Sequence, residues 1–330
     1  MEYFYTKKTA WDELLVRLLV SHDIFGPVAG EHFQEYEHLS SATVPEVIYN
    51  RPKPASPLKI FFLPVRENVT SPRKQEKQRI IIGAPACDTE ALGLLDEIYL
   101  DSDFEDVFYR SRRQNTIIIS SDCFDVMEHC HCTSYGIRPW DEKKADAAVA
   151  VKGDTLFIRI ISEKGRKFIS DTGVFTPVTD SSMVSFIDSR HRETESMLER
   201  ANRLLPDYAR TGSLVKESGQ ALWVKHSATC VSCGACTTIC PTCTCFLLID
   251  KPGFHKVKQM DACQYPGFER TAGGEDPLGE LHERFRNRYM CKYVWKPAKF
   301  HSTACTGCGR CIEACIGKID KNKLFMELAK

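Results

Sequence analysis

The chain has 330 residues, of which 43% are hydrophobic and 27% are charged, a balance typical of a soluble protein large enough for two domains. Lysine plus arginine equals aspartate plus glutamate at 44 each, so no net charge attracts nucleic acid or an anionic membrane. Because the longest apolar runs fall far short of the roughly 20 residues that span a bilayer, and the first residues lack the pattern of a secretory signal, we expect a cytoplasmic protein without a membrane span.

The N-terminal part of the chain alternates between helical and strand-like patterns. Apolar residues recur at helical spacing over 9–22. A strand is predicted near 59–63, a basic loop follows at 66–79, and a second strand is predicted at 80–83. This alternation favours an α/β layer for the beginning of the chain.

Two of the predicted strands lead to cysteines. The strand at 80–83 continues through a Gly-Ala-Pro turn to Cys87 and a helix over about 89–98, for which Asp88 is the predicted N-cap. A strand at 116–120 leads to Cys123. Functional groups of α/β folds gather at the ends of neighbouring strands, so these two cysteines are candidates for a common site.

Further strands at 147–151 and 155–161 and a long helix over about 180–205 complete the first part of the chain. The composition then shifts to Cys, Gly and Thr. We expect an α+β protein with an N-terminal α/β domain at 1–220 and a cysteine-rich domain at 221–330, which carries a long insertion at about 246–300.

The cysteines are the anomalous feature of the composition. There are 16 of them, in tight groups rather than spread along the chain. A chain of this size without a secretory signal is no typical disulfide scaffold. Clustered cysteines in a reducing compartment are more often metal ligands, so we expect metal or cluster binding.

Two runs share the spacing C-x2-C-x2-C-x3-C, and in two-cluster ferredoxins the fourth cysteine of such a run binds the other cluster. Glycines within the runs are expected to let the backbone approach the sulfides. Ile316 replaces the usual proline after the second run, which leaves its N–H available to a sulfur. The alternative is zinc, for which two separated pairs are the usual pattern. We therefore expect 221–330 to form a two-[4Fe-4S] ferredoxin-like domain. The predicted ligands are Cys230, Cys233, Cys236 and Cys315 for cluster 1, and Cys305, Cys308, Cys311 and Cys240 for cluster 2.

Eight cysteines remain outside these two sets. Four in the first domain are candidates for a third cluster, and the alternative is four unrelated thiols. Four in the insertion are candidates for a fourth, and the alternative is buried free thiols that pack as small apolar groups. The candidates are Cys87, Cys123, Cys130 and Cys132 for the third cluster, and Cys243, Cys245, Cys263 and Cys291 for the fourth.

The insertion also contains an amphipathic helical pattern over 278–292. Apolar residues recur at helical spacing between Leu278 and Tyr289, and Arg284, Arg286, Arg288 and Lys292 are their charged neighbours. Such a run of charges usually forms a solvated face, which we expect here; the alternative is a surface that docks an acidic partner.

With these motifs in place, the sequence resembles the family that contains the A subunit of anaerobic sulfite reductase and the β subunit of sulfhydrogenase-type cytoplasmic NiFe hydrogenases. Flavin oxidoreductase subunits linked to heterodisulfide-reductase-like complexes are similar too. The resemblance covers nearly the whole chain. Its residues are Phe62–Glu67, Cys87, Asp88, Leu95, Asp96, Cys123, Cys130–Gly136, Cys240–Cys245, Cys263–Phe268, Ala272–Gly274 and Cys308–Cys311.

The resemblance implies an iron–sulfur electron-transfer subunit of an anaerobic oxidoreductase complex. Its partners would be a flavoprotein that oxidises NAD(P)H and a catalytic subunit, which is a sulfite reductase, a NiFe hydrogenase or a heterodisulfide-reductase-like protein. Two positions depart from the family pattern. Cys291 stands where relatives usually have His, which gives the insertion four thiols, and Glu275 stands where relatives often have His.

The chain shows no nucleotide-binding motif of its own. Neither G-x-G-x-x-G nor G-x-x-x-x-G-K-[ST] occurs in the required context, and no Ser/His/Asp set stands out. An electron relay needs none of these. Two alternatives stay open: a catalytic iron–sulfur enzyme, which would need a cluster with an open iron position, and a zinc-stabilised interaction module.

Overall fold

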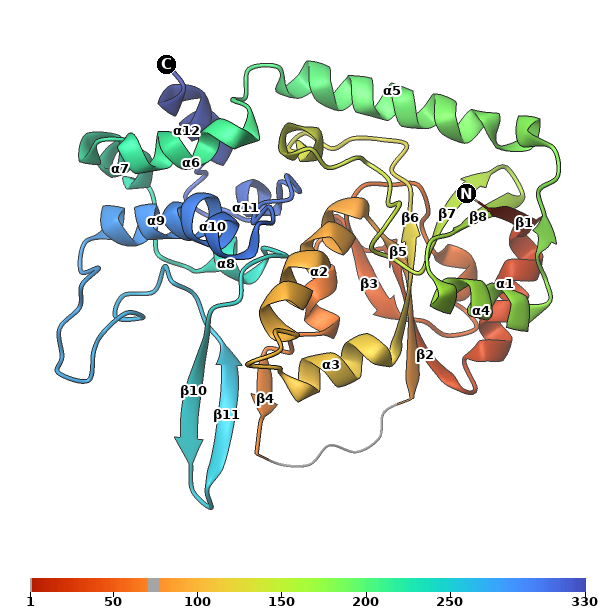
Figure 1. The fold of residues 1–330 in the computed structure, drawn as a ribbon, viewed down its shortest axis with the longest axis horizontal. Helices are drawn as coiled ribbons and strands as arrows, with labels where there is room; N and C mark the ends of the chain where they lie inside the picture. The colour runs from red at the N-terminus through yellow and green to blue at the C-terminus, as the bar shows by residue number, and fades with distance from the viewer. Residues whose placement is uncertain (1, 71–76) are drawn as a thin grey trace.

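The computed structural model describes residues 2–70 and 77–330, and an eight-stranded mixed sheet organises its first part (Figure 1). The strand order is β3-β2-β5-β6-β7-β8-β1-β9, in which neighbours from β2 to β7 run parallel and the remaining pairings are antiparallel. The expected mixture of helices and sheets is confirmed. The strands are β1 (Tyr3–Lys7), β2 (His22–Ala29), β3 (Gln34–His38), β5 (Gln78–Ala84), β6 (Thr116–Ser121), β7 (Ala147–Lys152), β8 (Thr155–Ile160) and β9 (Thr176–Pro177).

Helices cover both faces of this sheet because its central strands are apolar on both sides. Ile80 and Ile82 of β5 pack with α1 (Lys8–Leu18) and α4 (Glu163–Thr172), whereas Ile81 packs with α2 (Ala86–Tyr99) and α3 (Val107–Gln114). Alternate side chains of a strand point to opposite faces. A buried parallel strand is therefore a continuous apolar run, as the sequence showed.

The predicted strand near 59–63 is wrong, because Leu58–Phe61 forms a 3-10 helix, η2. The N–H of Leu58 donates to the carboxylate of Asp88 at 3.0 Å, which ties the segment to α2 instead of to a neighbouring strand. The predicted capping role of Asp88 is also wrong. Helix α2 begins at Ala86 after Pro85, and Asp88 lies within its first turn.

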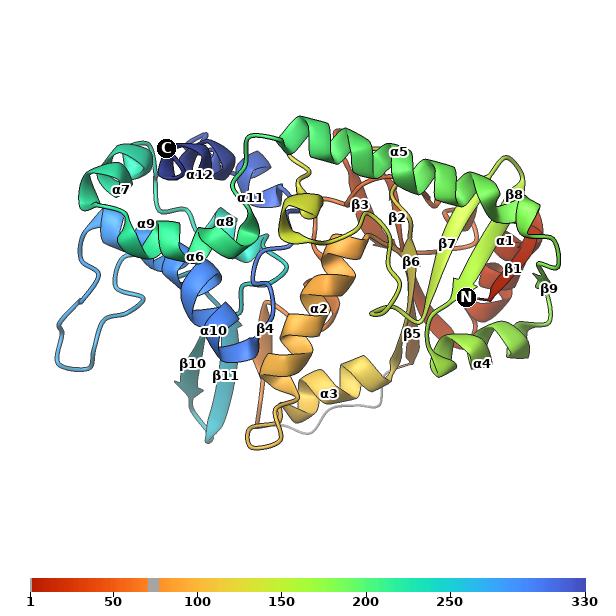
Figure 2. The same cartoon turned by 45° about the horizontal axis from the view of Figure 1, so that its top comes forward.

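The C-terminal part is mainly helical and lies beside the sheet (Figures 1 and 2). Helix α5 (Ser185–Asn202) runs from the sheet to this part of the molecule. A second core forms there around Trp223, Phe285, Tyr289 and Phe325. The other helices are α6 (Tyr208–Glu217), α7 (Gln220–Ser227), α8 (Ala235–Thr238), α9 (Leu281–Met290), α10 (Lys296–Phe300), α11 (Arg310–Glu313) and α12 (Lys321–Leu328), with the π-helix η5 (Cys291–Trp295) and the 3-10 turns η1 (Val44–Glu46), η3 (Cys132–Tyr135) and η4 (Ser181–Val184).

A small second sheet links the two parts of the chain. Strands β10 (Phe246–Lys251) and β11 (His255–Met260) form a hairpin, and β11 also pairs with β4 (Arg66–Asn68). The start of the predicted basic loop is therefore a strand, and its residues 71–76 lie outside the described part of the chain. Within the described residues, we find no helix that is both long and apolar enough to cross a bilayer.

Candidate metal centres

Each of the two cysteine runs folds as a loop that ends in one helical turn. The turns are α8 and α11, and they contact each other. Both follow a glycine in the left-handed region, Gly234 at φ 72° and Gly309 at φ 78°, which residues with a side chain adopt only at a cost. The contact between the turns brings cysteines of one run next to cysteines of the other.

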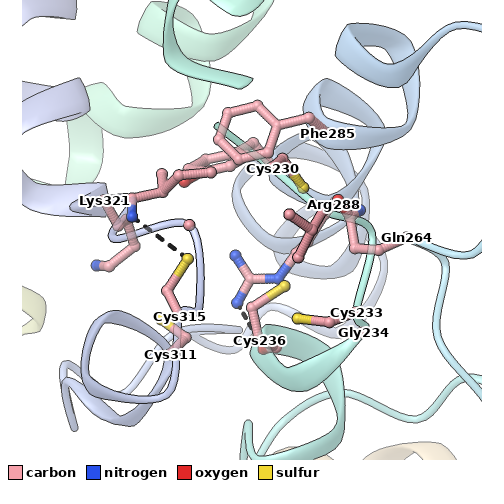
Figure 3. Close-up of a pocket in the computed structure, with 14 residues that line it drawn as sticks. Cys230, Cys233, Gly234, Cys236, Gln264, Phe285, Arg288, Cys311, Cys315 and Lys321 are labelled. Atoms are coloured by element: carbon pink, nitrogen blue, oxygen red, sulfur yellow. Dashed lines mark hydrogen bonds between the residues drawn. The ribbon is translucent and has the colours of Figure 1, made fainter. Parts of the chain in front are cut away.

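The predicted ligands of cluster 1 line one cavity, with the Arg288 side chain extending toward them (Figure 3). Cys311 lines the same cavity, so the space borders the second ligand set. The backbone N–H of Ile319 donates to Sγ of Cys315 at 3.3 Å, whereas the side chain of Ile316 is exposed. The cysteines around the cavity are Cys230, Cys233, Cys236, Cys311 and Cys315.

The predicted ligands of cluster 2 lie deeper in the molecule. Cys240, Cys305 and Cys308 are buried, whereas Cys233 of the first set is exposed. Burial raises the pKa of the Cys308 thiol to about 12, and the negative charges of Cys240 and Cys311 contribute to this increase. Three of the four predicted ligands thus influence one another electrostatically.

Two thiols of this set are stabilised as thiolates despite their burial. A hydrogen bond from Cys243 and the charge of Lys292 hold the pKa of Cys240 well below its usual value. Burial opposes ionisation of Cys305, but the Lys321 ammonium and a hydrogen bond with His131 lower its pKa well below the usual value. A thiolate is the form of cysteine that binds metal.

Within the described residues, four of the cationic side chains buried around these cysteines have no carboxylate partner. Lys59 Nζ donates to the carbonyl oxygen of Cys243 at 3.0 Å, and Arg288 Nη2 donates to that of Cys236 at 2.9 Å. The other two are Lys292 and Lys321. Their exposed fractions are between 1% and 3%.

The predicted solvated face of helix 278–292 is therefore wrong for the side chains that matter most. Arg284, Arg288 and Lys292 are all buried. Arg288 and Lys292 point toward the cysteine runs, whereas Arg284 donates to the carbonyl oxygens of Leu278 and Gly279. The three cations recur every four residues, which is the spacing of one helix face. That spacing was the signal in the sequence that could have identified them.

These buried cations test whether an iron–sulfur cluster fits the chain. Within the described residues, the acceptors of Lys59, Lys292 and Lys321 are carbonyl, hydroxyl, imidazole and thiol groups rather than carboxylates. Nε of Arg288 is buried and has no hydrogen-bond partner in the part of the chain that the structure describes. Isolated buried charges are costly. An anionic cluster held by thiolates would supply the missing negative charge, so the residues fit it.

The four cysteines of the N-terminal group also gather around one cavity. Cys87 follows β5 and Cys123 follows β6, and these strands are parallel neighbours in the sheet. Cys130 and Cys132 complete the group, and Cys308 of the second run lines the same space. The other side chains around the thiols are mostly apolar, including Pro52, Pro85, Ala86, Val126, Pro139 and Leu198.

The glycines of the second run serve a purpose that the sequence did not indicate. A Cβ on Gly307 would lie 2.4 Å from the carbonyl oxygen of His131, and one on Gly309 would lie 2.3 Å from that of His129. The N–H of His131 donates to the carbonyl oxygen of Gly307 at 2.8 Å. These glycines therefore let the second run pack directly on the N-terminal cysteine segment.

The insertion cysteines are held as two pairs. Cys243 donates a hydrogen bond to Cys240, and Cys245 donates one to Cys263, which lowers the pKa of Cys263 to about 6. The hydrogen bond with Cys263 and burial raise the pKa of Cys245, and the negative charge of nearby Cys291 adds to this increase. Cys243 is thus hydrogen-bonded to a predicted ligand of cluster 2, and the other three thiols lie near one another.

No three His, Cys, Asp or Glu side chains in the described ranges 2–70 and 77–330 lie close enough to hold a single metal ion. Ligand sulfurs of one zinc ion would lie about 3.8 Å apart, since each Zn–S bond is about 2.3 Å in a tetrahedral site. The four irons of a cubane occupy separate corners, so its ligands stand farther apart.

The buried pair Asp88–Arg310 was not foreseen. Arg310 Nη1 and Nη2 donate to the two carboxylate oxygens of Asp88 at 2.5 and 2.8 Å, and both side chains are about 1% exposed. One residue follows Cys87 and the other precedes Cys311. The pair therefore joins the N-terminal cysteine group to the second run.

Comparison with known proteins supports iron–sulfur clusters in the part of the chain that carries the two runs. Residues 229–319, which include both runs, match the 4Fe-4S dicluster domain. The chain is 27% identical to sulfhydrogenase 2 subunit beta of Pyrococcus furiosus, over 99% of this chain and 98% of the relative. The resemblance expected from the sequence is confirmed, and so is the assignment to 4Fe-4S electron transport.

Proposed function

We propose that this chain is the iron–sulfur subunit that relays electrons between a flavin- and NAD(P)H-binding partner and a catalytic redox subunit. The observation that carries the proposal is the meeting of two matching cysteine runs among four buried cations, Lys59, Arg288, Lys292 and Lys321, that have no carboxylate partner within the described residues. The relative is named as a subunit of a sulfhydrogenase, which favours a hydrogenase as the catalytic partner. Sulfite reductase and heterodisulfide-reductase-like subunits are the other candidates.

The proposed ligand sets are those of the sequence pattern. Cluster 1 takes Cys230, Cys233, Cys236 and Cys315, and cluster 2 takes Cys305, Cys308, Cys311 and Cys240. We extend the proposal to a third cluster at Cys87, Cys123, Cys130 and Cys132, because these thiols surround one mostly apolar space. We also propose a fourth cluster at Cys245, Cys263 and Cys291, with Cys243 as the remaining thiol. Its support is weaker because Cys243 donates its hydrogen bond to Cys240, a ligand of cluster 2.

Contacts between the groups support a linear order of the proposed clusters. Cys308 lines the N-terminal cavity, and Cys311 lines the cavity of cluster 1. Cluster 2 would therefore lie between the third cluster and cluster 1. On the insertion side, the Thr237 hydroxyl lies 4.0 Å from Sγ of Cys236 and 3.8 Å from Sγ of Cys263. Electrons could thus cross the molecule in short steps.

The clusters, when bound, accept and donate single electrons at potentials that lie somewhere between roughly −700 and +450 mV. The chain's residues fix the thiolates, exclude water from Cys240, Cys305 and Cys308, and balance the negative charge with buried ammonium and guanidinium groups. No bond to a side chain forms or breaks during the transfer. An electron that enters at one end leaves at the other.

The test replaces one ligand of each ferredoxin-type set in the full chain. Cys233→Ala and Cys308→Ala should each lower the iron content by about four atoms per chain, which is one [4Fe-4S] cluster, and stop electron transfer to the partner. The control is Val231→Ala, an exposed residue between the first two cysteines, which should keep its iron. Normal iron content and normal relay rates in both cysteine variants would refute the assignment.

A further inference from the structure

Two buried lysines reach thiols of the cluster 2 ligands. Lys292 Nζ lies 3.1 Å from Sγ of Cys240, and Lys321 Nζ lies 3.7 Å from Sγ of Cys305. They come from different elements, η5 and α12. One proposed cluster therefore has ammonium groups at two of its four ligands.

Other hydrogen bonds fix both ammonium groups in place. Lys292 Nζ also donates to Thr242 Oγ1 and to the carbonyl oxygen of Ala304, each at 2.6 Å. Lys321 Nζ donates to the Tyr135 hydroxyl at 2.8 Å and lies 2.8 Å from Nε2 of His131. Because neutral groups occupy these remaining positions, each positive charge is left to act on the thiol.

The local backbone explains the position of Lys292. Helix α9 widens into the π-helix Cys291–Trp295 before α10 begins. Single π-turns within helices are rare and often occur at functional sites, where they redirect a side chain. Lys296, one turn later, is not directed at the Cys240 sulfur; its Nζ donates to the carbonyl oxygen of Thr242 at 2.7 Å.

The cluster 1 ligands have a different environment. Arg288 and Lys321 both line the cavity of these ligands, but Arg288 donates to the carbonyl oxygen of Cys236, and the sulfur that Lys321 reaches belongs to Cys305. Within the described residues, the hydrogen-bond partners of the thiols in this set are neutral: the N–H of Ile319 at Cys315 and the Thr237 hydroxyl at Cys236. Cys233 is exposed, so water also screens charge there.

We propose that Lys292 and Lys321 raise the reduction potential of cluster 2 above that of cluster 1, so that an electron shared by the pair resides on cluster 2. The inference rests on the proposed ligand sets. Reduction adds one negative charge to a cluster, and a fixed ammonium at its thiolates stabilises that charge. Burial alone would have the opposite effect, since it disfavours the more charged state.

The experiment is a redox titration of the anaerobically purified full chain, followed by the electron paramagnetic resonance of the reduced clusters. Lys292→Met removes the charge but keeps a side chain of similar length. It should lower the midpoint potential of one cluster by at least 59 mV, which corresponds to a tenfold change in a one-electron equilibrium constant. Lys292→Arg keeps the charge and should restore most of the difference. Lys296→Met, which removes a lysine bonded only to oxygen atoms, should leave the potential unchanged.

Three results would overturn the inference. The first is an unchanged potential in Lys292→Met with normal iron content. The second is an equal decrease in Lys296→Met. The third comes from the cysteine variants and needs no lysine variant. In it, the signal lost in Cys308→Ala, which belongs to cluster 2, would have a midpoint potential equal to or below that of the signal lost in Cys233→Ala, which belongs to cluster 1. This third comparison decides the matter even if Lys292→Met fails to assemble. A wild-type chain without iron would instead refute the proposed ligand sets.

Discussion

At the scale of single residues, buried charge is the feature that distinguishes this chain. Asp88 and Arg310 form an ion pair with two hydrogen bonds at the junction between the N-terminal cysteine group and the second run. The carboxylate also accepts the N–H of Leu58. Burying both ions costs free energy, and the good geometry offsets that cost only while both partners are present.

We therefore expect Asp88→Ala to lower the free energy of unfolding by about 3–5 kcal/mol, because it leaves the Arg310 guanidinium buried and unpaired. Urea unfolding of the full chain, followed by circular dichroism, measures the effect. Glu193→Ala is the matched control, since it breaks an exposed pair with Arg190 and should cost no more than about 1 kcal/mol. Equal losses in the two variants would show that the buried pair has no special importance.

Residue spacing predicted the thiols of this site but not the charges around them. A C-x2-C-x2-C-x3-C run has few alternative meanings, so the sequence alone suffices to propose its cysteines as ligands. A lysine such as Lys59 or Lys321 looks the same in the sequence whether it is solvated or buried. Its burial depends on segments that are distant in the chain, as the contact between Lys321 and His131 illustrates.

At the scale of elements, the close packing of two loops holds the cysteine groups together. The loop of the second run lies against residues 129–132, where a side chain on Gly307 would overlap backbone atoms. Gly307 also has φ 63°, in the left-handed region. The close backbone atoms and the left-handed φ both disfavour a residue with a Cβ at this position.

Gly307→Ala should destabilise the chain by about 2–5 kcal/mol, the sum of left-handed backbone strain and the overlap with the loop. It should also release iron from the third and second proposed clusters, which meet there. Gly153→Ala is the control, because Gly153 has φ 57° but no atom near its Cβ position. It should cost only about 1–2 kcal/mol and keep its iron. Thermal unfolding and iron analysis measure both, and equal effects would contradict the packing argument.

Local sequence predicted most of the sheet, but it failed where distant contacts decide the structure. The isoleucine-rich strands β5 and β6 were recognisable because they are buried on both faces. The apolar residues of η2 gave the same signal, but Leu58 bonds to Asp88 and the segment forms a 3-10 helix. The pairing of β4 with β11 joins residues almost 200 positions apart, and no local pattern indicates it.

At the scale of the whole molecule, the cysteine groups form a continuous series from the sheet to the insertion. The N-terminal group lies at the ends of β5 and β6, the two runs follow, and Cys263 lies beyond them near Thr237. The β4–β11 pairing and the Asp88–Arg310 pair tie the two parts of the chain together. This arrangement suits an electron relay, since its distances depend on how firmly the parts are joined.

Iron and acid-labile sulfide in the anaerobically purified full chain, measured together with its paramagnetic resonance after reduction, test the central claim most directly. We predict more than eight iron atoms per chain, a matching amount of sulfide, and the paramagnetic resonance signal of reduced clusters. A count of eight would leave clusters 1 and 2 and remove the additional ones. A chain without iron or sulfide, or one that contains zinc instead, would contradict the account.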